Sequence, residues 1–167
     1  MTTLHTLTVP VFAKLLKNAS VWIDKAQVHA EQRKFDVDTL LQARLAPDMF
    51  PLVRQFQSAS DTAKGCTARL AGVDNPKFAD EEKTFAEIRV RLDKTIAFIS
   101  SVDAALVAAG EDREIVLSPE RKFATGHEYV AQHALPNFFF HFTTAYAILR
   151  HNGVDVGKAD YLRGGAR

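Results

Sequence analysis

The chain has 167 residues, a length at which a single domain is the usual outcome and a continuous hydrophobic core can form. Hydrophobic residues make up 47% of it and charged residues 25%, as in ordinary globular proteins, which argues against both a disordered chain and a membrane protein. The formal net charge is only +1, so we expect neither nucleic acid nor a membrane surface as a partner.

The only cysteine, Cys66, cannot form an intrachain disulfide, and we expect it to be buried and inert on an apolar helix face. Residues 1–10 lack the basic start and the apolar run of a secretory signal. The most apolar region, residues 134–149, is interrupted by Pro136 and Asn137 and is too short to cross a bilayer. These features predict a cytoplasmic protein without a membrane span.

Apolar residues repeat at spacings of three and four along the first two thirds of the chain and predict three long helices. The first covers about 9–32, with Thr8 as the N-cap and Pro10 in the first turn. The second covers about 48–70, beginning at Asp48 and ending before Gly72. A segment rich in turn-forming residues, 72–77, separates it from the third helix, which covers about 81–101.

After a short helical turn at 104–109, residues 113–117 and 121–124 are predicted to form two short strands around Ser118 and Pro119. Thr125 and Glu128 fit a capping box that begins a fourth long helix, which runs to about Asn152 and should bend at Pro136. Residues 158–167 should form a flexible tail.

These elements predict an all-α fold: one domain over residues 1–167, a four-helix bundle with a small β-hairpin between helices three and four. The short joints favour an up-and-down order, although the long connection between helices three and four also permits a crossover.

A polar stripe on the fourth helix is the most informative feature for function. Steps of four residues place Tyr129, His133, Asn137 and His141 in one slowly precessing line among phenylalanines. Polar groups in such surroundings need partners, and the candidates near the start of the second helix are Asp48, Arg54 and Gln55.

Two interpretations of this stripe stay open: a ligand pocket in the bundle, or histidines that only hydrogen-bond within the fold. The stripe is an incomplete zinc motif, because Asn137 is a poor ligand where a second histidine would be needed. No glycine-rich phosphate loop, serine nucleophile elbow or Cys/His finger is present in the sequence.

Several longer segments of the chain resemble one bacterial family, the domain of unknown function DUF1993. The segments that carry the resemblance are residues 43–52 (ARLAPDMFPL), 61–65 (DTAKG), 70–72 (LAG), 135–141 (LPNFFFH) and 145–154 (AYAILRHNGV). That family is similar in fold to the DinB-like (DinB/YfiT) metalloenzymes, four-helix bundles that often dimerise. The resemblance therefore implies a DinB-like bundle and a homodimer.

The DinB-like pattern holds a divalent metal through three histidines, one on the second helix and two on the fourth. His141 falls at the last of these positions, Asn137 replaces the ligand four residues earlier, and Arg54 or Gln55 stands where the ligand of the second helix would be. The resemblance thus implies a degenerate metal site. We expect no cofactor, with zinc or nickel at His141 as the alternative.

The expected function is binding of a small molecule in a polar pocket on the fourth helix. The pocket residues would be His133, Asn137, His141, Arg54, Gln55, Tyr129 and Asp48. Two alternatives stay open: a metal-dependent thiol transferase or hydrolase of the DinB-like type, and a structural or stress-associated interaction protein.

Overall fold

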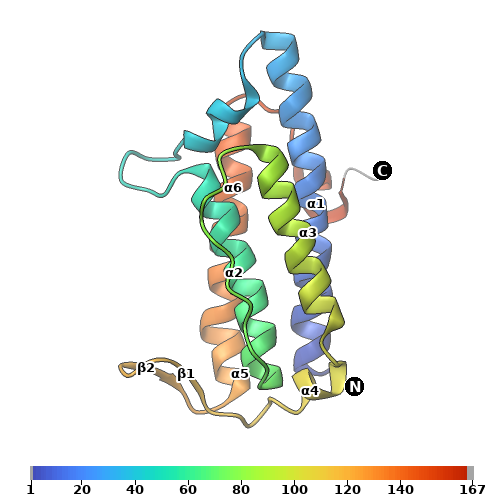
Figure 1. Cartoon of the computed structure of the whole chain (residues 1–167), viewed down its shortest axis with the longest axis vertical. Helices are drawn as coiled ribbons and strands as arrows, with labels where there is room; N and C mark the ends of the chain where they lie inside the picture. Colours follow the sequence, from blue (N-terminus) through green and yellow to red (C-terminus); the bar gives the residue numbers. More distant parts are fainter. Residues whose placement is uncertain (1, 165–167) are drawn as a thin grey trace.

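The computed structural model describes residues 2–164, and four long helices form its body (Figure 1). They are α1 (Leu4–Arg33), α2 (Leu52–Ala71), α3 (Phe85–Ser101) and α6 (Leu135–His151). The shorter elements are the 3-10 helix η1 (Val37–Gln42), α4 (Ala104–Ala108), β1 (Ile115–Ser118), β2 (Arg121–Phe123), α5 (Gly126–Tyr129), the π-helical turn η2 (Val130–Ala134) and α7 (Lys158–Arg163). The predicted four-helix bundle with a hairpin between its third and fourth long helices is confirmed.

The order of the helices differs from the favoured up-and-down order, because α2 and α3 run parallel (Figure 1). Gln57 near the start of α2 binds Glu82 just before α3, whereas Gly110 beyond α3 packs against Leu70 at the end of α2. The crossover is therefore residues 72–84, not the connection between helices three and four. An extended chain covers about twice the distance per residue of a helix, so this segment can run back along α2.

α1 begins one turn earlier than predicted. Thr3 and Thr6 form a capping box in which each hydroxyl accepts the other residue's backbone N–H, at 3.3 and 2.9 Å. Thr8, the predicted N-cap, instead lies buried inside the helix, where its hydroxyl donates to the carbonyl of Leu4 at 2.6 Å. The two threonines at the true start are therefore a stronger signal than the proline at position 10.

α2 begins at Leu52 rather than at Asp48. Pro51 is the N-cap residue, and a proline disfavours the helical conformation of the residue before it, here Phe50. Asp48 consequently lies in an exposed turn before the helix.

The irregularity expected near Pro136 takes the form of a π turn. The backbone N–H of Leu135 donates to the carbonyl of Val130, five residues back, directly before the proline that has no N–H to donate. α5, η2 and α6 thereby form one continuous helical segment that Thr125 caps.

The prediction of a flexible tail over residues 158–167 is wrong for residues 158–164. Residues 165–167 lie outside the described part of the chain. Residues 158–163 form α7, which packs on α1. Asp160 is buried and pairs with Lys25 at 2.8 Å, while the Tyr161 ring stacks on Trp22 at 5.7 Å between centroids. This ion pair and aromatic packing hold the segment to the bundle.

The core lies between the four long helices and is filled by aromatic and aliphatic side chains, among which the largest buried ones are Trp22, Tyr129, Phe12, Phe56, Phe138 and Phe142. Within residues 2–164, no helix combines the length and the apolar character that crossing a bilayer requires.

Candidate functional site

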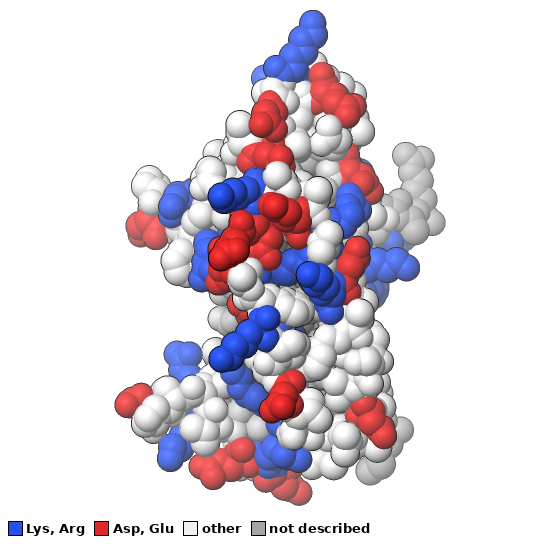
Figure 2. Space-filling view, viewed as in Figure 1, with Lys and Arg blue, Asp and Glu red and all other residues white. Residues whose placement is uncertain are grey.

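The polar stripe of the fourth helix lines a groove of about 280 Å³ between α2, α6 and the hairpin. In Figure 2 the outline of the molecule is hollowed between the hairpin and the segment before α2. The stripe contributes Tyr129, His133, Asn137 and His141, and the opposite wall carries Ser58, Asp61, Thr62, Arg69 and Leu117. The structure therefore brings the predicted stripe together with a polar face of α2.

Gln55, one of the predicted partners, holds the His141 ring in place. Its Nδ1 lies 2.8 Å from Oε1 of the buried Gln55, whose Nε2 donates to the carbonyl of Phe50 at 2.9 Å. The amide assignment makes Nδ1 the protonated nitrogen and leaves Nε2 as an acceptor. Burial, together with the charge of Arg54, lowers the pKa of His141, so the ring is neutral at physiological pH.

Asn137 is positioned by α2. Its Nδ2 donates to Oγ1 of Thr62 at 2.7 Å, and that hydroxyl donates to the carbonyl of Ser58 at 2.7 Å. Within residues 2–164, Oδ1 of Asn137 accepts no hydrogen bond from the protein. Asn137 therefore presents an amide oxygen to the groove.

Two rings of the stripe, Tyr129 and His133, line the end of the groove near the hairpin. The His133 ring stacks on Phe123 with 5.9 Å between centroids and an angle of 27° between the planes, and the Tyr129 ring lies 5.8 Å away. Burial, followed by the charges of Arg121 and Arg69, lowers the pKa of His133. His133 is thus a neutral imidazole beside two guanidinium groups.

Tyr129 is buried and serves as an anchor rather than as an acid. Its hydroxyl accepts a hydrogen bond from Arg69 at 3.3 Å, and burial raises its pKa to about 12. Cys66, expected to be inert, is also fully buried, and burial raises the pKa of its thiol to about 12. Neither group is a nucleophile at neutral pH.

Three predicted pocket residues do not line the groove: Gln55 is buried against His141, and Asp48 and Arg54 lie elsewhere. Asp48 is exposed in the turn before α2, and it does not line the groove. Arg54 turns away from α6 toward the crossover, where it pairs with Asp80 and donates to Gln57 at 3.0 Å. Neighbouring positions on a helix point in different directions, so Gln55 faces His141 and Arg54 does not.

Three groove residues on α2, Ser58, Thr62 and Arg69, escaped prediction, although the sequence carries a signal for them. They share one helix face with the predicted Gln55, since the spacings from residue 55 onward are three, four and seven. Aligned with the stripe of the fourth helix, this face would have predicted two polar walls that meet.

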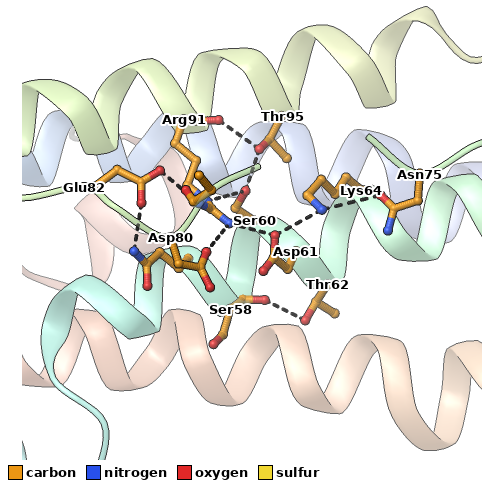
Figure 3. Close-up of polar contacts among 12 residues, drawn as sticks. Ser58, Ser60, Asp61, Thr62, Lys64, Asn75, Asp80, Glu82, Arg91 and Thr95 are labelled. Carbon is orange, nitrogen blue, oxygen red and sulfur yellow. Dashed lines mark hydrogen bonds and ion pairs between the residues drawn. The ribbon is translucent and has the colours of Figure 1, made fainter. Parts of the chain in front are cut away.

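A second polar cluster lies on the opposite side of α2, beneath the crossover (Figure 3). Arg91 is 2% exposed, and its guanidinium donates to Asp61 at 2.7 Å, to Glu82 at 2.9 Å and to the carbonyl of Ala79 at 3.0 Å. Lys64 pairs with the same Asp61 at 3.1 Å. Asp61 therefore lines the groove, but its charge is neutralised by Arg91 and Lys64, which belong to the cluster beneath the crossover.

The donors around His141 do not fit the three-histidine metal set that the DinB-like pattern implies. The groups that meet there are one imidazole and the amides of Asn137 and Gln55, the latter already bonded to the imidazole. Among residues 2–164, no three His, Cys, Asp or Glu side chains lie together in a group that could hold a metal ion.

Comparisons with known proteins agree on the family. The family model described as "Domain of unknown function (DUF1993)" matches residues 4–162. A crystal structure of a DinB family member protein from Shewanella denitrificans is 46% identical, with a TM-score of 0.90 over 98% of this chain and 93% of that one. No curated protein matches. The chain belongs to the DUF1993 family, and its bundle is similar to that of a DinB family member.

Proposed function

We propose that the groove between α2 and α6 binds a small molecule through hydrogen bonds and without a metal. One observation carries the proposal: neutral and charged polar groups line a single groove and keep hydrogen-bonding capacity that the described part of the protein does not use. These groups are Nε2 of His141, Oδ1 of Asn137 and the guanidinium of Arg69.

The geometry supports binding because the groups are already held in place. Gln55 fixes the His141 ring, and Thr62 fixes the Asn137 amide, so little rotamer freedom is lost when a ligand binds. Ligand sites in proteins commonly combine an aromatic wall with a few oriented polar groups, and His133 on Phe123 supplies such a wall.

The proposal is tested by screening small polar fragments by NMR against 15N-labelled protein. We expect binders that shift amide signals along α2 and α6 at the groove, and that shift them less in His133→Gln and Asn137→Leu variants. His151→Gln is the matched control, because His151 lies exposed at the far end of the same helix. Fragments that bind only elsewhere, or equally well to all variants, would contradict the proposal.

Metal analysis separates this proposal from the metalloenzyme alternative. Protein purified without a histidine tag should contain no stoichiometric zinc, nickel or iron, and His141→Ala should leave the metal content unchanged. Stoichiometric metal that the substitution removes would favour a metal-dependent transferase or hydrolase instead.

The homodimer stays a prediction. Light scattering at micromolar concentration should give twice the mass of the chain, 18.5 kDa. A monomer mass would refute it.

A further inference from the structure

The arginine at the hairpin end of the groove differs from the other cations that lie near it. Arg91 and Lys64, both nearly buried, are each paired with carboxylates. Arg69 is half-buried, yet within residues 2–164 its guanidinium makes no ion pair and donates only to the hydroxyl of Tyr129. A partly desolvated guanidinium gains most from a charged acceptor, and here the protein supplies none.

Gly65 provides the space in which this guanidinium lies. A β-carbon at Gly65 would come within 2.5 Å of Nη1 and 3.5 Å of Cζ of Arg69. Glycine inside a helix costs roughly 1 kcal/mol relative to alanine, and Gly65 stands in the middle of α2. The side chain of Arg69 therefore folds back along α2 because residue 65 has no side chain.

The electrostatics of this end of the groove favour a negative group. Arg69 and Arg121 both act on His133, where their charges help to lower the pKa of the ring. The single carboxylate that lines the groove, Asp61, is bound by Arg91 and Lys64 and cannot neutralise Arg69 as well. Within the described residues, the hairpin end of the groove is thus cationic.

We propose that the ligand of the groove carries a carboxylate or phosphate group that Arg69 binds, with Gly65 as the residue that makes the geometry possible. The inference rests on the proposed function and adds the class of ligand to it. A guanidinium matches either anion through two parallel N–H donors. The rest of the ligand would run past His133 toward the amide oxygen of Asn137 and Nε2 of His141.

The test uses three probes on the full-length, 15N-labelled protein: inorganic phosphate, benzoate and the neutral analogue benzamide, at equal ionic strength. We expect at least one of the two anions to bind at the groove and to shift the Nε–Hε signal of Arg69. Phosphate and benzoate separate the two anion chemistries, and benzamide shows whether charge is needed.

Arg69→Gln should weaken binding of the anion by about tenfold or more, the range for hydrogen bonds to charged groups. Gly65→Ala is the sharper variant, because alanine favours the helix while its β-carbon displaces the guanidinium. It should lose affinity without losing thermal stability. Arg150→Gln is the matched control, since Arg150 is exposed on α6 and, in the part of the chain that the structure describes, forms an ion pair only with the exposed Asp155.

Anion binding that survives both Arg69→Gln and Gly65→Ala would overturn the inference. So would binding of neutral fragments at the groove together with no response to either anion, and in that case the proposed function stands. If neither the anions nor any neutral fragment binds at the groove, both the proposed function and this inference fail.

Discussion

The two sides of α2 carry polar clusters of opposite character. On the side of the crossover, Arg91 is surrounded by acceptors, and the buried hydroxyl of Ser60 lies 2.6 Å from that of Thr95 (Figure 3). On the side of α6, Arg69, Asn137 and His141 each have one hydrogen-bonding partner and face a groove. A polar cluster that satisfies itself stabilises the fold, whereas one that leaves donors and acceptors open is suited to a ligand.

The largest expected effect is the loss of Arg91. Arg91→Met should reduce the free energy of unfolding by about 3 to 5 kcal/mol, because it leaves the nearly buried Glu82 without its cation and removes the hydrogen bonds to Asp61 and to the carbonyl of Ala79. Arg89→Met is the control two residues earlier, since Arg89 pairs with the exposed Asp24 and should contribute less than about 1 kcal/mol. Urea denaturation measures both, and equal losses would remove the distinction between the two sides of α2.

Two serines on α2, one on each side of the helix, allow the stability contributions of the two clusters to be compared with smaller expected effects. Ser60→Ala should cost about 1 to 2 kcal/mol, because the hydroxyl is buried and contacts both Thr95 and Arg91. Ser58→Ala, which removes a hydroxyl that lines the groove, should change stability by less than about 0.5 kcal/mol. Thermal denaturation of the pair is the measurement, and a Ser58→Ala loss as large as that of Ser60→Ala would contradict the assignment of roles.

The smallest effect concerns the charge of His133. Arg69→Gln should raise the pKa of His133 toward its ordinary 6.5, because one of the positive charges that lower it is gone. NMR titration of the ring protons measures this, with Arg150→Gln as the control. A pKa that does not move would mean that burial and the charge of Arg121 account for the lowered value without Arg69.

The same shift determines how stability depends on pH. The pKa of His133 is lower in the folded chain than in the unfolded one, so the unfolded chain takes up the proton first as the pH falls through 6.5. The contribution of His133 to stability is therefore complete above pH 6.5 and is lost below it. His133→Gln should flatten the stability profile in that range, and an unchanged profile would refute this reading.

Much of the fold follows from short-range patterns. Apolar spacing predicts the four long helices, and the capping pair Thr125 and Glu128 predicts the start of the last helical segment. Local signals mispredicted the start of a helix where two of them competed. The first helix begins after the cap at Thr3 and not at Pro10, and the second begins after Pro51 and not at Asp48. The prediction of a flexible tail failed because the packing of Tyr161 on Trp22 joins residues that are far apart in the chain.

The sequence by itself determined which residues could form a polar line on the fourth helix, because helical geometry depends only on spacing. Only the tertiary structure decided what faces that line, since the crossover makes α2 parallel to α3 and antiparallel to α6. That arrangement sets Gln55 against His141 and Thr62 against Asn137. It also leaves Arg69 without a carboxylate partner in the described chain, and this depends on packing between elements that no local pattern encodes.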